Sequence, residues 1–443
     1  MPYLLNLAYV LLLAAASPWL LWAAWRKGKY RRGWRAKLWG DVPAREGDEP
    51  CIWIHAVSVG EVNLVAPLIA ELRRRRPGWA FVLTSTTDAG LELAQRKYPD
   101  IASCYAPLDF SWAVRRAMRR IRPAMLMLVE LELWPNLIRA ASEAGASVAV
   151  VNGRLGERSF RGYRRIRRLL HSTLERIAVV GVQNEEYRGR FEQLGVDPRR
   201  LSITGSLKFD GACADRGNRR TRDLAELAQL GADDVVFLAG STQAGEESAS
   251  LDTYRALAAD HPQLRLILVP RHPERFEEVA QLCRRSGLRL ARRSEWLPSS
   301  AGAKGGATGE PWQVLLVDTV GELGAWWGTA QIAFVGGSFG DRGGQNMIEP
   351  AAYGAAVSFG PNTWNFRDIA AALLARDAAV VVADGKALTA FVRYCLKDRN
   401  FAHGLGSRAQ QLVRENLGAT ARTADLTIPL VVITSSQPSL SAA

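Results

Sequence analysis

Side chains that can carry chemistry directly follow four short apolar runs of the sequence. They lie in the segments His55–Glu61, Glu130–Glu132, Arg271–His272 and Gly336–Glu349. If the apolar runs form parallel strands, these segments stand at the carboxyl ends of the strands, where such sheets bind their ligands. A carboxylate there suits general-base catalysis, and an arginine suits the binding of a phosphate. A glycine-rich turn before a helix suits close approach of a phosphate to the backbone, although such turns also serve simply to reverse the chain.

The acidic candidates each have two interpretations. Glu61 in HAVSVGE is either a general base whose pKa is raised by burial, or a carboxylate that stabilises the positive end of the following helix. Glu130 and Glu132 alternate along a predicted strand, so we expect only one of them to face a site.

Two of the basic candidates, His272 and Lys208, also have two interpretations each. Arg271 suits a clamp on a phosphate, whereas His272, before Pro273, is either a ligand-binding or a structural histidine. Lys208 in TGSLKFD either neutralises a departing phosphate or is an exposed loop lysine. The sequence contains no GxGxxG after the first strand and no GxxxxGK[ST], which argues against a dinucleotide oxidoreductase and a P-loop NTPase. It also contains no Asp-x-Asp, which removes one common way of holding a metal–diphosphate.

The elements that must position these residues follow a strand–turn–helix pattern that occurs in both halves of the chain. Continuous apolar runs such as CIWIH, MLMLV and LRLILV, separated by helical segments, predict parallel sheets covered on both faces. We therefore predict an α/β protein with two doubly wound, Rossmann-like domains. The predicted divisions are an N-terminal segment 1–40, a first domain 41–210, a linker 211–224, a second domain 225–430 and a tail 431–443.

The charge of the chain is concentrated in its first half. The 443 residues carry a formal net charge of +13, and residues 1–210 contain 33 Lys and Arg against 20 Asp and Glu. Residues 211–443 contain 24 of each kind. This asymmetry argues against a uniformly basic nucleic-acid coat and predicts an anionic partner for the first half. The five scattered cysteines form no CxxC pair, which argues against a zinc ribbon or a disulfide framework.

The N-terminal segment is apolar and is followed by basic residues. Residues 3–25 carry no charge, whereas Arg26, Lys27 and Lys29 begin a basic stretch. Because a spanning helix needs about 20 apolar residues, this pattern predicts a membrane span or anchor with its basic flank in the cytoplasm. The alternative is a buried or interfacial helix, which Pro18 favours over a straight span.

Taken together, the motifs resemble those of the 3-deoxy-D-manno-octulosonic acid (Kdo) transferases. The segments that carry the resemblance, in family order between about residues 50 and 370, are HAVSVGE, VELELWPNLI, NGRLGERS, QNEE, TGSLKFD, PRHPERF, DTVGEL, GGSFGDRGGQNMIEP and FGPNTWNF. The resemblance implies a GT-B fold, in which two Rossmann-like domains face each other across a cleft. The first domain then binds the acceptor, and the second binds CMP-Kdo.

The resemblance also implies an activity and its place in the cell. Members of the family transfer Kdo from CMP-Kdo to a lipid A precursor (lipid IVA) with inversion, during the synthesis of the lipopolysaccharide core. We therefore expect an enzyme at the cytoplasmic face of the bacterial inner membrane, held there by its N-terminal helix. We expect no metal or other cofactor and no nucleic-acid partner. The number of Kdo residues transferred, the acylation of the acceptor and the oligomeric state are not predicted.

By the same resemblance, the candidate residues acquire roles. Glu61 resembles the general base, and Glu130 and Lys208 match positions that stabilise the transition state. The positions that match the CMP-binding residues are Arg271, His272, Gly321, Glu322, Leu323, Asn346, Met347, Ile348 and Glu349.

The sequence departs from the family pattern at three positions. Gln243 and Gln345 replace family histidines, and Met347 replaces a proline. Glutamine cannot serve as a proton carrier at neutral pH, but it still forms hydrogen bonds. Two other classes of function compete with the first: another GT-B transferase or epimerase that uses a UDP- or GDP-linked sugar, and a non-enzymatic tether that binds anionic lipid.

Overall fold

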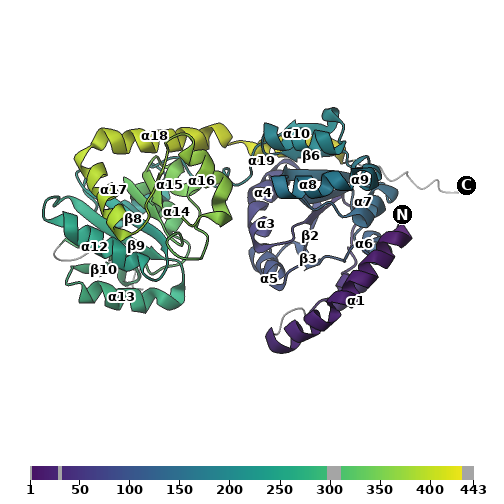
Figure 1. Cartoon of the computed structure of the whole chain (residues 1–443), viewed down its shortest axis with the longest axis horizontal. Helices are drawn as coiled ribbons and strands as arrows, with labels where there is room; N and C mark the ends of the chain where they lie inside the picture. The colour runs from purple at the N-terminus through teal and green to yellow at the C-terminus, as the bar shows by residue number, and fades with distance from the viewer. Residues whose placement is uncertain (1, 28–31, 297–310, 432–443) are drawn as a thin grey trace, which may run out of the picture. The chain divides into compact units, whose positions relative to one another are not determined.

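The chain forms two compact units (Figure 1), and the computed structural model describes residues 2–27, 32–296 and 311–431. Unit 1 comprises residues 1–210 and 417–443, and unit 2 comprises residues 211–416. Each unit contains one seven-stranded sheet in which every strand pairing is parallel. The predicted α/β class with two doubly wound sheets is therefore confirmed.

The sheet of unit 1 has the strand order β3-β2-β1-β4-β5-β6-β7. Its strands are β1 (Cys51–His55), β2 (Ala80–Ser85), β3 (Ala102–Tyr105), β4 (Met125–Val129), β5 (Ser147–Gly153), β6 (Val179–Val182) and β7 (Leu201–Ile203). Its helices are α1 (Pro2–Lys27), α2 (Trp34–Trp39), α3 (Val59–Leu64), α4 (Ala66–Arg75), α5 (Asp88–Lys97), α6 (Ser111–Ile121), α7 (Pro135–Glu143), α8 (Glu157–Arg165), α9 (Arg167–Leu174), α10 (Glu185–Leu194) and α19 (Ala419–Thr427).

The sheet of unit 2 has the order β10-β11-β9-β8-β12-β13-β14. Its strands are β8 (Val235–Thr242), β9 (Leu264–Pro270), β10 (Leu290–Arg292), β11 (Val314–Leu316), β12 (Ile332–Val335), β13 (Ala356–Phe359) and β14 (Val380–Val381). Its helices are α11 (Arg219–Leu227), α12 (Glu246–Ala258), α13 (Phe276–Arg285), α14 (Leu323–Trp326), α15 (Ile348–Ala352), α16 (Arg367–Leu374), α17 (Gly385–Lys397) and α18 (Arg399–Asn416).

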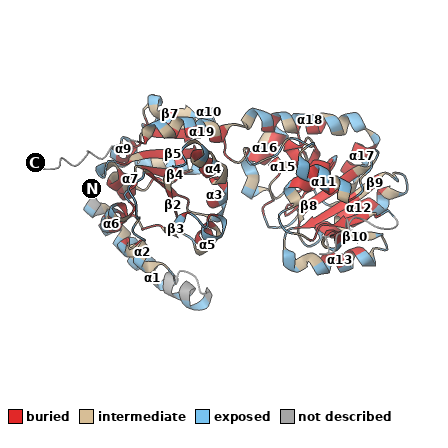
Figure 2. Ribbon diagram, turned by 180° about the vertical axis from the view of Figure 1, so that it is seen from behind, coloured by how far each residue is buried: buried red, intermediate tan, exposed pale blue. Residues whose placement is uncertain are grey.

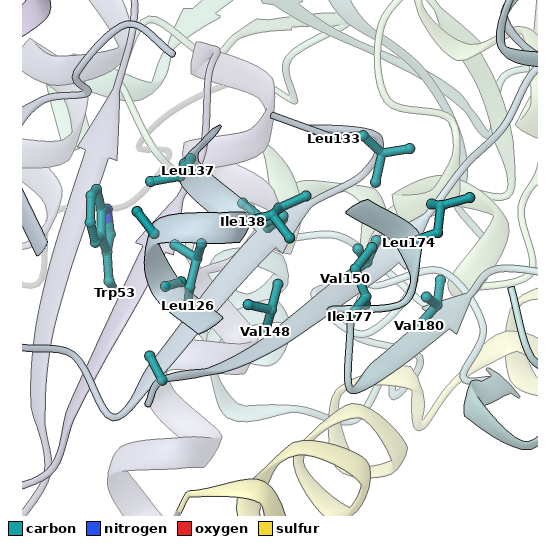
Figure 3. Packing of buried hydrophobic residues seen from close by; sticks show 14 of the residues in the cluster. Trp53, Leu126, Leu133, Leu137, Ile138, Val148, Val150, Leu174, Ile177 and Val180 are labelled. Atoms are coloured by element: carbon teal, nitrogen blue, oxygen red, sulfur yellow. The ribbon is translucent and has the colours of Figure 1, made fainter. Parts of the chain in front are cut away.

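The continuous apolar runs form strands because both faces of each sheet are covered by helices (Figure 2). In β1 and β4 of unit 1, successive side chains enter two different hydrophobic clusters. Trp53 and Leu126 lie in one cluster, where they pack with Leu137 of α7 (Figure 3), and Ile54 and Met127 lie in the other. This division is the two-residue alternation expected of a strand that is buried on both sides.

The segment 417–431 belongs to unit 1, whereas we predicted a second domain that continues to residue 430. Helix α19 packs against α4 and β6. The carboxylate of Asp210 accepts hydrogen bonds from the backbone N–H groups of Gly418 (2.6 Å) and Thr420. Ser147 in β5 donates to the carbonyl oxygen of Leu430 at 2.7 Å. The returning segment therefore completes the first core rather than the second. Apart from Val431, the predicted tail 431–443 lies outside the described residues.

Helix α1 lies along unit 1 beside α6 (Figure 1) and is fixed there by buried polar contacts. Asn6 is 7% exposed; its Nδ2 donates to Ser111 Oγ at 2.7 Å, and its Oδ1 accepts from the Ser111 N–H at 3.0 Å. The Tyr9 hydroxyl donates to Asp109 at 3.1 Å. Within the described parts of the chain, no helix combines the length and the apolar character needed to cross a membrane. The predicted span over residues 3–25 is thus not supported.

A close contact between two glycines in unit 2 gives a first prediction. A Cβ atom at Gly406 in α18 would lie 2.1 Å from the carbonyl oxygen of Gly354, just after α15. A Cβ atom at Gly404 in the same helix would meet only the flexible end of Arg408, at 3.3 Å. We expect Gly406→Ala to lower the free energy of unfolding by about 1–3 kcal/mol through overpacking. Gly404→Ala should raise it by about 0.5–1 kcal/mol, because glycine disfavours a helix interior. Urea unfolding of both variants measures this, and equal effects would contradict the proposed contact.

Candidate active site

Glu61 is held at the carboxyl end of β1 by the start of α3. Ser58 is the N-cap residue of α3, and its hydroxyl accepts from the Glu61 N–H at 3.4 Å. The Glu61 carboxylate reaches back to accept from the Val57 N–H at 2.8 Å and from the Ser58 hydroxyl at 3.1 Å. This reciprocal arrangement resembles a capping box, except that Glu61 accepts from the N–H group of Val57, one residue before the N-cap, so Glu61 does stabilise the helix start. The helix-capping interpretation and the general-base interpretation are therefore compatible.

The surroundings of Glu61 change its acidity. Burial, and to a smaller extent the nearby carboxylates of Glu132 and Glu130, raise the pKa of Glu61 to about 7, against the hydrogen bonds from Val57 and Ser58. A carboxyl group with a pKa near 7 can accept a proton at neutral pH and still hold it firmly enough to drive the transfer. The pKa of Glu61 is thus in the range that suits a general base.

Glu130 and Glu132 both lie close enough to Glu61 for their charges to act on it, and the strand alternation from which we expected only one of them to face the site is not found. Strand β4 ends at Val129, so the two residues stand in the following turn and do not alternate along a strand. Glu130 has a φ of 59°, a left-handed conformation that is strained for a residue with a side chain. The Trp134 indole N–H donates to Glu132 at 2.6 Å, and burial raises the pKa of Glu132.

Asn152, at the end of β5, links Glu130 to the loop that carries Lys208. Its Nδ2 donates to Glu130 Oε1 at 3.5 Å, and its Oδ1 accepts from the Leu207 N–H at 3.0 Å. Lys208 is half-buried in the loop after β7. The structure therefore brings Glu61, Glu130 and Lys208 to the same edge of the sheet in unit 1, while the predicted role of Lys208 remains a prediction.

In unit 2, Arg271 and the glycine-rich segment meet. Arg271 follows β9, and its Nε donates to Gln345 Oε1 at 3.3 Å. Gln345 also packs beside Gly337, where a Cβ atom would lie 3.2 Å from Gln345 Cγ. Gln345 thus supplies an acceptor for Arg271 in place of the family histidine. His272 is partly exposed, and its Nδ1 lies 3.5 Å from Glu274 Oε1.

The other predicted nucleotide-binding residues form a second group in unit 2. The carboxylate of Glu322 accepts from Arg293 at 2.8 Å and from Thr319 at 2.7 Å, and this fixes the turn around Gly321, whose φ is 87°. Glu349 lies beside this segment, since a Cβ atom on Gly324 would be 3.7 Å from Glu349 Oε2.

At the start of α15, the polar residues form their own hydrogen bonds. Asn346 Nδ2 donates to Glu349 Oε1 at 2.9 Å, and Asn346 Oδ1 accepts from the Ile348 N–H at 3.1 Å. Burial raises the pKa of Glu349. The side chains of Met347 and Ile348 are buried in the core, so only their backbone is suited to contact a ligand.

Glu246 is a further functional candidate that the sequence did not indicate. Its carboxylate, in a residue that is 1% exposed, accepts from the N–H groups of Gly337, Ser338 and Phe339 at 2.7, 2.9 and 3.0 Å, and from Gln243 at 2.8 Å. One carboxylate thus fixes the glycine-rich loop after β12 against the turn after β8. The only sequence signal is an acidic residue after Gly245, and acidic residues are common in the first turn of a helix.

Among the described residues, no group of three or more His, Cys, Asp or Glu side chains is arranged to hold a metal ion. The chemistry that these sites can perform with their own side chains is proton transfer in unit 1 and the binding of an anionic group in unit 2.

Comparison with known proteins agrees with this arrangement. The family model of 3-deoxy-D-manno-octulosonic-acid transferase (kdotransferase) matches residues 29–211. A curated 3-deoxy-D-manno-octulosonic acid transferase of Bordetella pertussis is 33% identical over 436 residues, covering 94% of this chain and 97% of the relative. That of Haemophilus influenzae is 34% identical over 381 residues, covering 85% of this chain and 86% of the relative.

Among solved structures, UDP-GlcNAc 2-epimerase from Neisseria meningitidis matches with a TM-score of 0.55 and 11% identity, covering 86% of this chain and 100% of the epimerase. At that identity the match shows a shared fold alone, which agrees with the predicted GT-B class. The full-length similarity to transferases decides against an epimerase and against a non-enzymatic tether. The chain therefore belongs to the Kdo transferase family of glycosyltransferases.

Proposed function

We propose that this enzyme transfers Kdo from CMP-Kdo to a lipid A precursor of the lipid IVA type, with inversion at the anomeric carbon, in lipopolysaccharide core biosynthesis. The observation that carries the proposal is the partly buried carboxyl group of Glu61, whose pKa is about 7, at the carboxyl edge of the sheet in unit 1. An inverting transfer needs one base on the acceptor side, and Glu61 has the acidity and the position for that role.

In the proposed reaction, Glu61 takes the proton of an acceptor hydroxyl while that oxygen attacks the anomeric carbon of Kdo. The bond between this carbon and the CMP phosphate oxygen breaks, and its electron pair leaves with CMP. Lys208 stabilises the charge that develops in the transition state, and Arg271 binds the phosphate of the donor. Glu130 fixes the polar surroundings of the base through Asn152. No metal ion takes part in these steps.

The proposed donor site lies in unit 2 and is formed by backbone loops as well as by side chains. Glu246 holds three consecutive N–H groups of the glycine-rich loop in place, and Glu322 fixes the turn at Gly321. Preorganised loops of this kind bind an anionic ligand without the cost of ordering them first. Arg271 supplies the positive charge beside them.

The proposed acceptor and location are supported by unit 1. The excess positive charge of residues 1–210 suits a bisphosphorylated lipid and an anionic membrane surface. Apolar side chains are also exposed on α1, α2 and α6, among them Leu11 (61%), Trp39 (60%) and Trp112 (42%). Clustered aromatic and aliphatic side chains beside basic ones are typical of proteins that lie on a membrane. We therefore place the enzyme at the cytoplasmic face of the bacterial inner membrane, with α1 in contact with the lipid.

The proposal is tested by incubating the purified enzyme with CMP-Kdo and lipid IVA in the presence of a chelator. We expect mass spectrometry to show addition of Kdo, and NMR of the product to show inversion at the anomeric carbon. The Haemophilus influenzae relative serves as the positive control. Absence of transfer under conditions in which that relative is active would reject the proposal.

The acidity of Glu61 gives a pH prediction. Because only the ionised carboxylate accepts a proton, we expect kcat/KM to fall as the pH drops through about 7. Glu132→Gln removes a negative charge that raises the pKa of Glu61, so this limb of the profile should move to lower pH. A profile that is unchanged in Glu132→Gln would contradict the role of Glu61.

Glu61→Gln should reduce turnover by at least about 10²-fold while leaving CMP binding intact. The folded-state pKa lies above the usual value for a carboxyl group, so the charge of Glu61 disfavours folding increasingly as the pH rises from the usual carboxyl range to about 7, and the full cost remains above that pH. The variant should therefore be no less stable than the wild type at pH values above that, as measured by thermal unfolding. A loss of activity accompanied by unfolding would not support a catalytic role.

The donor site gives a binding prediction. Arg271 is exposed, so Arg271→Ala should leave stability unchanged but weaken CMP binding by at least about tenfold through loss of a charge-assisted contact. Arg284→Ala is the control, because Arg284 is an exposed arginine on α13 that pairs with Glu277. Calorimetric titration with CMP measures both affinities. Equal affinities in the two variants would exclude Arg271 from the site.

A further inference from the structure

A pocket of about 580 Å³ in unit 1 is not used by the proton transfer described above. One wall is formed by Leu12, Leu13 and Ala16 of α1, and the opposite wall by Leu131, Leu133 and Trp134 in the turn after β4. Its lining is predominantly apolar, and its volume lies in the range of ordinary small-molecule sites. Helix α1 is therefore one side of a binding cavity as well as an N-terminal extension.

The pocket exists because α1 is held firmly against unit 1. The buried side chain of Asn6 bonds both the hydroxyl and the N–H group of Ser111, and Tyr9 bonds Asp109. Asp109 in turn accepts from the N–H groups of Asn136 at 3.1 Å and Leu137 at 2.7 Å at the start of α7. These contacts fix α1 relative to the segment that forms the opposite wall.

The polar groups of the wall point to an apolar occupant. Asp109 already accepts from Tyr9 and from the two N–H groups, and Glu132 Oε2 accepts from the Trp134 indole at 2.6 Å. Glu132 Oε1 and the side chain of Tyr163 add polar atoms to the lining, and the carboxylate of Glu132 disfavours a phosphate there; the other lining residues offer mainly carbon atoms, which favour a hydrocarbon.

The pocket is continuous with two surfaces that matter for a lipid substrate. Glu132 lines the pocket, and its charge acts on the candidate base Glu61, so one end of the pocket lies next to the reacting edge. Leu12 lines the pocket and is also 65% exposed, so the pocket borders the exposed apolar side of α1. A chain attached to the acceptor sugar can thus extend from the reacting edge towards the membrane-facing helix.

We propose that this pocket binds one fatty acyl chain of the lipid acceptor and thereby places the acceptor hydroxyl at Glu61. The inference rests on the proposed function, because it takes the acceptor to be an acylated sugar. It assigns α1 a role in substrate binding that is separate from membrane attachment. Each methylene that the pocket buries contributes about fourfold to affinity, so filling the pocket has a large effect on an acylated acceptor.

The test compares two tryptophan substitutions in the same helix. Both alanines are exposed on α1, but only Ala16 lines the pocket, so Ala16→Trp places an indole in the pocket and Ala15→Trp adds the same indole outside it. We expect Ala16→Trp to raise KM for lipid IVA by at least about tenfold, with KM for CMP-Kdo unchanged, and to leave KM for the fully deacylated acceptor unchanged. Ala15→Trp should behave as the wild type with both acceptors. Equal effects of the two substitutions, or an equal loss with the deacylated acceptor, would overturn the inference.

A second measurement needs no turnover and separates this inference from the proposed function. Tetradecanoic acid carrying a terminal diazirine is irradiated with the full-length protein, and the labelled residues are identified by mass spectrometry. We expect labelling within α1 and residues 131–135 that is lost in Ala16→Trp and kept in Ala15→Trp. This result supports an acyl site even if lipid IVA proves not to be the acceptor. Labelling elsewhere, or labelling that Ala16→Trp does not change, overturns the acyl site even if Kdo transfer is observed.

Discussion

The burial of Glu61 beside two further carboxylates at one sheet edge is the constraint on which the chemistry proposed for unit 1 depends. Glu61, Glu130 and Glu132 come from separate positions in the chain, and they meet because β1 and β4 are parallel neighbours. Burial and the neighbouring carboxylates favour the protonated forms of Glu61 and Glu132, while the N–H group of Val57 favours the charged form of Glu61 and the indole of Trp134 that of Glu132. The balance leaves one carboxyl group with a pKa close to neutrality. Such a balance costs stability, and the strained backbone of Glu130 adds to that cost.

The two units use an acidic residue in the same place for different purposes. In each unit a glutamate stands near the start of the helix that follows the first strand of the sheet: Glu61 after β1 and Glu246 after β8. Glu61 accepts two hydrogen bonds and remains partly exposed, so it can still exchange a proton. Both oxygens of Glu246 are engaged by four N–H groups, so its role is to hold a loop in shape. The two carboxylates thus differ in the number of backbone N–H groups that they accept from: one for Glu61 and four for Glu246.

This difference shows what could and could not be predicted from the sequence. Continuous apolar runs predicted the parallel strands, and the polar residues after them predicted which edge carries Glu61 and Arg271, since both follow from local pattern. The effect of the Glu132 charge on Glu61 depends on where β4 ends and on the left-handed turn at Glu130. The spacing of apolar residues in the sequence does not reveal either feature. The role of Glu246 depends on a loop more than 90 residues away in the chain. The return of α19 to the first core likewise depends on contacts with α4 and β6, which are distant in sequence.

From its apolar pattern, we expected α1 to be either a membrane anchor or a helix packed on the protein. The structure gives it features of both. Its exposed leucines and tryptophans suit contact with lipid, yet Asn6 and Tyr9 are bonded to unit 1. An asparagine with no partner would be costly in a hydrocarbon environment, whereas beside Ser111 all of the polar groups are satisfied. The buried amide therefore fixes which face of α1 turns towards the protein and leaves the opposite face exposed. In the function that we propose, a helix held in this way brings a lipid acceptor to the sheet edge that carries Glu61.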